Sequence, residues 1–207
     1  MLKKIEKSIF LTKPIIGVVG RKIDNYFKIN ESVKNAIEKC GGIPFLILPN
    51  ENIDEVLELC DGIIMPGGTD IYDYDKYICE YCIKNDKPVL GICLGMQIMA
   101  CINNDYLVKN EFNHHGTYHK INTKKGSIIN KVIGDTIVNS RHNEHVTNVD
   151  EYIVTATSED GYIEAIEYPN KRFNIGVQWH PEDMLDDIKE YNLIKMFIDS
   201  CKLDKIS

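Results

Sequence analysis

Residues 88–100 read Pro88-Val89-Leu90-Gly91-Ile92-Cys93-Leu94-Gly95-Met96-Gln97-Ile98-Met99-Ala100. The apolar run after the proline predicts a short buried strand, and the residue spacing after Cys93 predicts a helix. The chain must then turn sharply at Cys93, which has a glycine two positions before it and another two positions after it. Such a strained turn brings neighbouring backbone very close, so residues without a Cβ atom are needed on either side. The pattern predicts a nucleophile elbow with Cys93 at a helix N-terminus, where unpaired N–H groups favour a thiolate.

A second strand that ends in polar residues lies near the C-terminus, in Asn174-Ile175-Gly176-Val177-Gln178-Trp179-His180-Pro181-Glu182. A Gly-x-Cys-x-Gly motif alone is more often a buried turn than a catalytic site. Together with this second stretch, the motif favours a catalytic site. A cysteine nucleophile needs a base, and the base needs an acceptor that orients it. His180 and Glu182 are two residues apart and are stiffened by Pro181, so we expect their side chains to point the same way. Cys93, His180 and Glu182 are therefore the predicted catalytic triad.

Alternating strand and helix patterns predict an α/β fold with a mainly parallel sheet, helices on both faces and functional groups at the carboxyl ends of the strands. Predicted strands cover 14–20, 43–48, 62–65 and 88–93, and predicted helices cover 31–40, 52–60, 77–85 and 94–102. Segment 21–30 is a predicted loop at the rim of the site. Between 106 and 173 the alternating residues predict antiparallel strands, and a last helix is expected over 188–201.

The length and composition are consistent with one enzyme domain. The chain has 207 residues, 43% of them hydrophobic and 27% charged, with a net charge of −7. We expect a polar N-terminal extension over 1–13 and a single catalytic domain over 14–207. The acidic balance and the lack of a basic block argue against a nucleic-acid or membrane partner. Without a long apolar run or a signal-peptide pattern, the expected location is the cytoplasm.

Gly67 and Gly68 follow the predicted strand over 62–65 and also fall at a carboxyl strand end. The N–H of Leu94, directly after the nucleophile, and the N–H of Gly67 or Gly68 are predicted to form an oxyanion hole. A Gly-Gly pair alone would more often be a simple tight turn.

Two histidine and cysteine spacings have to be weighed against metal binding. Cys79-Glu80-Tyr81-Cys82 has zinc or redox spacing, but no second pair exists and its flanks predict a helix. His115 and His119 are four apart, but Gly116 and the β-branched residues near it favour a strand or loop. The seven cysteines of a cytosolic chain are expected to be free thiols. We therefore predict no metal site and no cofactor.

Together, Gly-Ile-Cys-Leu-Gly-Met-Gln at 91–97, Gly-Val-Gln-Trp-His-Pro-Glu at 176–182 and Met-Pro-Gly-Gly at 65–68 resemble the class I (triad-type) glutamine amidotransferases. The resemblance extends from about 15 to 182 and implies their flavodoxin-like three-layer fold. Segments 138–142 and 160–167 are most similar to the γ-glutamyl hydrolase branch typified by γ-glutamyl-γ-aminobutyrate hydrolase (peptidase C26). The resemblance favours Gly67 over Gly68 for the oxyanion hole.

The same resemblance suggests which residues contact the substrate. It places segment 138–146 beside the substrate, with Gly68, Arg141, His142 and Asn143 as candidate contacts. The branch often carries His-His-Gln where this chain has His142-Asn143-Glu144, a departure that bears on the leaving group. Gln97 matches a position that contacts the glutamyl group in members of the family. From its chemistry alone, Gln97 could equally be a polar residue that packs within the helix layer.

The predicted reaction is hydrolysis of a γ-glutamyl amide through a γ-glutamyl thioester on Cys93. One interpretation is a stand-alone hydrolase of γ-glutamyl amines or glutamine. Two features favour it: no synthetase domain is fused here, and Asp183 stands where ammonia-transferring relatives commonly carry Ser. The alternative is a glutaminase subunit that supplies ammonia to a separate synthase, and the compact length favours it. A non-catalytic relative would need a broken triad, and this triad is intact. The expected partners are a small γ-glutamyl substrate, a second copy of the chain in a homodimer and, under the alternative, the synthase.

Overall fold

The computed structural model describes residues 13–104, 107–109 and 115–202, so nearly all of the extension predicted over 1–13 lies outside the described residues. The helices are α1 (Glu31–Lys39), α2 (Ile53–Leu59), α3 (Asp73–Lys84), α4 (Leu94–Ala100), α5 (Ile128–Val132), the 3₁₀ helix η1 (Pro181–Asp183) and α6 (Ile188–Ser200). The strands are β1 (Ile15–Val19), β2 (Arg21–Ile23), β3 (Tyr26–Lys28), β4 (Ile43–Ile47), β5 (Gly62–Met65), β6 (Val89–Ile92), β7 (Leu107–Lys109), β8 (Thr117–Thr123), β9 (Thr136–Ser140), β10 (Glu144–Val146), β11 (Ile153–Ser158), β12 (Ile163–Glu167) and β13 (Asn174–Val177).

A nine-stranded mixed sheet organises the molecule, in the order β4-β1-β5-β6-β13-β12-β11-β8-β9. In this order, the first five strands, β4-β1-β5-β6-β13, pair in parallel with their neighbours. The remaining pairings, from β13 through β12, β11 and β8 to β9, are antiparallel. Strand β13 therefore joins the two halves, with Val177 opposite Ile92 of β6 on one side and opposite Ala165 of β12 on the other. This arrangement confirms the predicted α/β fold with a mainly parallel core and an antiparallel segment.

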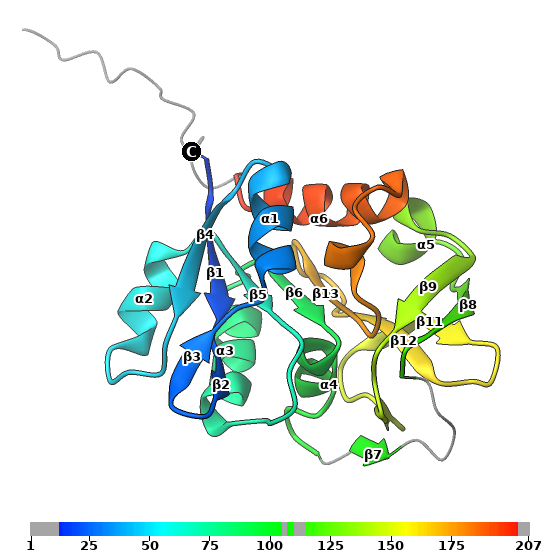
Figure 1. Ribbon diagram of the computed structural model, residues 1–207, viewed down its shortest axis with the longest axis horizontal. Coiled ribbons are helices and arrows are strands. Elements are labelled where there is room, and N and C mark those ends of the chain that lie inside the picture. The colour runs from blue at the N-terminus through cyan, green and yellow to red at the C-terminus, as the bar shows by residue number, and fades with distance from the viewer. Residues whose placement is uncertain (1–12, 105–106, 110–114, 203–207) are drawn as a thin grey trace, which may run out of the picture.

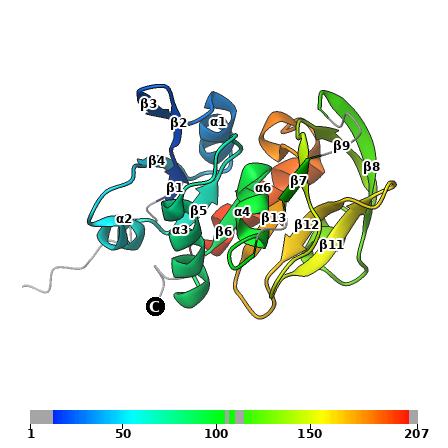
Figure 2. The same ribbon diagram turned by 90° about the horizontal axis from the view of Figure 1, so that it is seen from below.

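Helices cover both faces of the sheet, as Figures 1 and 2 show for α1 and α6 on one side and α3 and α4 on the other. One buried cluster joins the sheet to α1 and α6 and includes Ile37 and Phe197. A second cluster on the opposite face joins the sheet to α2, α3 and α4 and includes Leu57, Ile78 and Ile98. Apolar side chains therefore fill both interlayer spaces, which confirms the three layers.

The structure corrects three details of the prediction. Segment 21–30 is not only a loop: β2 and β3 pair within it as an antiparallel hairpin, with Arg21 opposite Lys28. Helix α3 begins at Asp73 rather than at 77, because the Asp75 carboxylate accepts the N–H of Tyr72 at 3.0 Å and so caps the helix from within. Helix α5 was not predicted, and it begins where the Ser127 hydroxyl accepts the N–H of Asn130.

The carboxyl ends of the parallel strands meet at one edge of the sheet, where the β2–β3 hairpin and the start of α4 also lie (Figure 1). Residues that follow β1, β5, β6 and β13 are therefore brought together although they are far apart in sequence. Of the helices in the described part of the chain, none has both the length and the apolar character needed to cross a bilayer.

Candidate active site

The turn from β6 into α4 places Cys93 in a left-handed backbone conformation, with φ 51° and ψ −107°. Such a φ is strained for a residue with a Cβ, and such strain is typical of functional sites. The Cys93 N–H donates to the carbonyl oxygen of Val177 at 2.8 Å, which ties the turn to β13. A Cβ added to Gly95 would overlap the backbone oxygen of Met65, and one added to Gly91 would overlap the Met99 sulfur. Both glycines of the predicted elbow are therefore required by packing.

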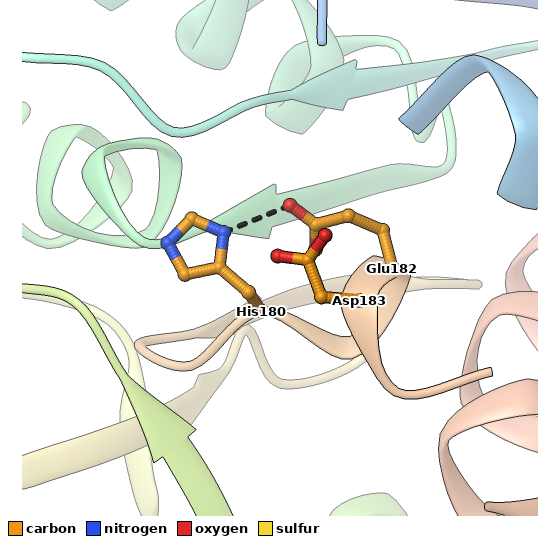
Figure 3. Close-up of side chains that lie close together, drawn as sticks. All are labelled: His180, Glu182 and Asp183. Carbon is orange, nitrogen blue, oxygen red and sulfur yellow. Dashed lines mark hydrogen bonds and ion pairs between the residues drawn. The ribbon is translucent and has the colours of Figure 1, made fainter. Parts of the chain in front are cut away.

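His180 and Glu182 come together just beyond β13, where η1 turns the chain back. His180 Nδ1 lies 2.8 Å from Glu182 Oε1, and both side chains are buried (Figure 3). Burial alone would lower the pKa of His180, but hydrogen bonds to Cys93 and Glu182, together with their negative charge, raise it to about 10. The hydrogen bond to Cys93 links the base to the predicted nucleophile. The three residues of the predicted triad are thus linked, and the raised pKa of His180 favours the protonated imidazole.

Asp183 lies beside this pair but has a different partner (Figure 3). Its Oδ2 forms an ion pair with Arg141 Nη1 at 2.7 Å. One ligand atom from each of His180, Glu182 and Asp183 lies within 4.8 Å of the others, so the trio has the donors for a cation. Each of the three already has a polar partner, since Glu182 accepts from His180 and Asp183 from Arg141. The geometry is that of an oriented base next to a surface ion pair.

Gly67 lies against both His180 and Cys93, the predicted base and nucleophile. A Cβ added to Gly67 would be 2.9 Å from His180 Cε1 and 3.6 Å from Cys93 Cβ. A Cβ added to Gly68 would instead be 3.0 Å from Arg21 Cδ and from Leu94 Cδ2. Leu94 is the first residue of α4. Gly67 is therefore the glycine next to the reacting groups, and Gly68 supports the side chains around them.

A cavity of about 320 Å³ opens onto Cys93 and His180. Gly67, Gly68 and Arg141 also line it, as does the β2–β3 hairpin through residues that include Arg21. The predicted position of segment 21–30 at the rim is therefore confirmed, in the form of a hairpin. This volume suits a small substrate such as an amino acid derivative.

Gln97 is buried and is not among the residues that line the cavity. Its Nε2 donates to the Glu144 carbonyl oxygen and to Gln178 Oε1, both at 3.1 Å. Gln178 Nε2 in turn lies 3.5 Å from Cys93 Sγ. Gln97 is thus linked to Cys93 through Gln178, which matches the packing alternative more closely than direct substrate contact.

His142 and Asn143 also lie outside the residues that line the cavity. His142 is buried, with Nδ1 2.9 Å from the Glu144 carbonyl oxygen and Nε2 3.7 Å from Glu164 Oε1. The same Glu164 oxygen lies 3.2 Å from His119 Nε2. Asn143 is exposed. Of the three candidates in this segment, Arg141 alone reaches the cavity wall.

Sequence reasoning missed Asn139 and Gln178 as site residues. The Asn139 side chain forms two hydrogen bonds with the backbone of His180, and Gln178 reaches the Cys93 sulfur. Gln178 precedes His180 by two residues, so the same alternation that paired His180 with Glu182 could have indicated it. The resemblance placed segment 138–146, which contains Asn139, beside the substrate, but no local pattern pairs Asn139 with His180, which is 41 positions away.

Comparisons with known proteins identify the family of the chain. Residues 22–200 match the family Glutamine amidotransferase class-I, and the chain therefore belongs to the class I glutamine amidotransferases. It is 26% identical to a glutamine amidotransferase-like protein, RP404, of Rickettsia prowazekii, over 92% of this chain and 98% of that protein. It is 29% identical to the glutamine-hydrolysing GMP synthase subunit of Picrophilus torridus, over 78% of this chain and 87% of that relative.

The solved structures support the fold. A GMP synthase subunit from Thermoplasma acidophilum superposes with a TM-score of 0.75 at 21% identity, covering 94% of this chain and 96% of that one. The chain also matches CTP synthases from several organisms, but it spans only 36–44% of their length. None of these comparisons singles out the γ-glutamyl hydrolase branch.

Proposed function

We propose that this class I glutamine amidotransferase hydrolyses the γ-amide of glutamine through a thioester on Cys93 and passes the released ammonia to a synthase partner. The observation that carries the catalytic part is the contact of Cys93 with His180, which is held by Glu182, beside Gly67 and at the floor of a small cavity. Nucleophile, base and orienting acceptor within hydrogen-bonding reach are the arrangement that cysteine acyl transfer requires.

In the first half of the reaction, the Cys93 thiolate attacks the γ-carbonyl carbon and a C–S bond forms. The N–H groups of Leu94 and Gly67 stabilise the negative charge on the oxygen of the tetrahedral intermediate. His180 then donates its proton to the amide nitrogen as the C–N bond breaks, and ammonia leaves. The raised pKa of His180 supports this role, because a protonated imidazole is available at neutral pH.

In the second half, neutral His180 accepts a proton from water as the water oxygen attacks the thioester carbon. The C–S bond breaks, glutamate is released, and the thiolate and imidazolium that began the first half are restored. Glu182 keeps Nδ1 hydrogen-bonded through both halves, so that Nε2 is the nitrogen that exchanges protons. No step of this sequence requires an added metal or organic cofactor.

The resemblance to the glutamine-hydrolysing GMP synthase subunit supports the synthase partner, because that relative is by its name one component of a synthase, and it is matched over most of its length. The stand-alone hydrolysis of γ-glutamyl amines, which the sequence motifs favoured, remains a prediction. The positively charged side chains around the cavity are the feature that would suit a larger, acidic γ-glutamyl substrate.

The deciding experiment is an assay of glutamate release by the purified protein, with glutamine and a panel of γ-glutamyl amines as substrates. We expect glutamine to be the preferred substrate, and Cys93→Ala to reduce its turnover by at least about 10³-fold while the fold is preserved. Activity retained by Cys93→Ala would refute the thioester mechanism. Preference for a γ-glutamyl amine over glutamine would instead support the stand-alone hydrolase.

A further inference from the structure

Arg21 is a buried arginine whose guanidinium is only partly used within the protein. It lies directly after β1 on the β2–β3 hairpin, and only 7% of its surface is exposed. Its Nη1 forms an ion pair with Asp75 Oδ1 at 2.7 Å. Nε and Nη2, by contrast, are buried and have no hydrogen-bond acceptor among the described residues. Leaving such charged donors unpaired is costly, which indicates that a ligand supplies the acceptor.

The two unpaired nitrogens have the geometry of a specific binding group. Nε and Nη2 present parallel N–H bonds on one edge of the guanidinium, which is the fork that a carboxylate fills with its two oxygens. Asp75 holds the opposite part of the group, and Asp75 is itself held by the N–H of Tyr72. The orientation of the fork is therefore fixed before any ligand binds.

Arg21 lies in the wall of the same cavity as the predicted reacting groups. Arg21 lines the space that Cys93 and His180 also line, and its aliphatic stem lies against Gly68, the neighbour of Gly67. Among the described residues, this cavity is lined by two arginines, two lysines and two histidines and by one acidic residue: Arg21, Lys22, Lys28, Arg141, His115, His180 and Asp70. In a protein with a net charge of −7, this is a local concentration of positive charge. Arg141 is already paired with Asp183, which leaves Arg21 as the buried cation with unpaired donors.

We propose that Arg21 binds a carboxylate of the γ-glutamyl substrate through Nε and Nη2, and so determines which amides reach Cys93. This inference rests on the proposed function and adds the recognition element for an anionic group. The carboxylate has two sources, the α-carboxylate of the glutamyl group or a carboxylate on the leaving amine. Both are carboxylates and would bind the guanidinium in the same way. Ligands that differ only in one of these carboxylates distinguish the two sources.

The test is calorimetric binding to the full-length Cys93→Ala protein, which is designed to hold substrate without turnover. The ligands are glutamine, 4-aminobutanamide, which lacks the α-carboxylate, γ-glutamylmethylamide, and γ-glutamylglycine, which adds a carboxylate on the leaving amine. Each is measured with and without Arg21→Lys, which keeps a charge for Asp75 but removes the fork. Lys22→Met is the control, because it removes a cation from the same hairpin and cavity.

If Arg21 binds the α-carboxylate, Arg21→Lys weakens glutamine binding by at least about tenfold and leaves 4-aminobutanamide unchanged. If it binds the leaving-group carboxylate, γ-glutamylglycine alone loses affinity. Equal affinities with and without Arg21→Lys, or a loss no larger than that of Lys22→Met, would overturn the proposal. Failure of the Cys93→Ala parent to bind any of the four ligands would instead refute the proposed function, and the inference with it.

A second variant protects the test against misfolding. Arg21→Gln combined with Asp75→Asn replaces the buried ion pair by a pair of amides and leaves no unpaired charge. This double variant should show the same ligand-selective loss as Arg21→Lys. Loss of all four ligands alike in both variants would mean that Arg21 only supports the cavity wall, which contradicts carboxylate recognition.

Discussion

The Asn139 side chain holds the backbone of His180 with two hydrogen bonds. Its Oδ1 accepts the His180 N–H at 2.8 Å, and its Nδ2 donates to the His180 carbonyl oxygen at 3.0 Å. Both residues are buried, and Asn139 lies in β9 at the opposite edge of the sheet from β4. The position of the base is therefore fixed from the antiparallel half, while that of the nucleophile is fixed from the parallel half.

Asn139→Ala should lower kcat by about 10- to 100-fold with little change in KM, because His180 would lose the contacts that aim it at Cys93. Steady-state kinetics with glutamine measure this split. Asn130→Ala is the matched control, since Asn130 also uses its side chain in a hydrogen bond, to Thr123, but does not touch His180. A rise in KM with unchanged kcat would place Asn139 in substrate binding instead.

Glu182→Gln should shift the alkaline limb of the kcat/KM profile to lower pH. The folded-state pKa of His180 is raised to about 10, so the imidazolium is present below that value and is lost as the pH rises through it. Removing the carboxylate removes one of the causes of the raised pKa, and the limb must move down. Asp183→Asn, a change at the neighbouring carboxylate, should leave the limb in place, and a matching shift there would contradict the assignment.

Gly95→Ala should destabilise the protein by about 3 kcal/mol or more and abolish activity, since the new methyl group meets the backbone oxygen of Met65, just before Gly67. Gly17→Ala is the control. A methyl group there meets only the ends of the Ile47, Cys60 and Ile63 side chains, which can shift, so the cost should be smaller. Denaturant unfolding of both variants gives the comparison, and equal costs would show that the backbone contact at Gly95 is not special.

The free energy of unfolding should fall as the pH rises from 5 to 8, and Glu190→Gln should make this fall smaller. Burial is the main cause that raises the pKa of Glu190 to about 7, although the Trp179 indole donates to it at 3.0 Å. A carboxyl with a raised folded-state pKa stabilises the protein most below about pH 4.5, and this contribution falls as the pH rises through 7. The effect amounts to roughly 3 kcal/mol.

Thermal unfolding followed by the fluorescence of Trp179, the single tryptophan, measures this dependence. The substituted amide keeps an acceptor for the indole and removes the titration, so the variant should be the more stable protein at pH 8. A parallel pH dependence of the two proteins would show that Glu190 does not titrate in this range.

The sequence was most informative where local sterics and chemistry coincide. Gly91, Cys93 and Gly95 have spacings that only a sharp strand-to-helix turn explains, and the structure has that turn. The alternation of strands and helices likewise predicted the parallel half of the sheet, because each pattern is local.

What the sequence could not supply were contacts made across the sheet. The buried ion pair of Arg21 and Asp75 joins the hairpin to α3, yet the two residues are 54 positions apart. The fixing of His180 by Asn139 is of the same kind, over 41 positions. Such pairs form only once the strands have been assembled, so residue patterns along the chain carry no trace of them.

Because β6 and β13 are hydrogen-bonded neighbours in the middle of the sheet, the residues that follow them are held from both the parallel and the antiparallel half. The hairpin that carries Arg21 lies at the rim and belongs to a separate small sheet. Bond cleavage and ligand choice are thus assigned to different parts of the architecture. Redesigning the hairpin should therefore retarget the enzyme to other amides without dismantling its reactive centre.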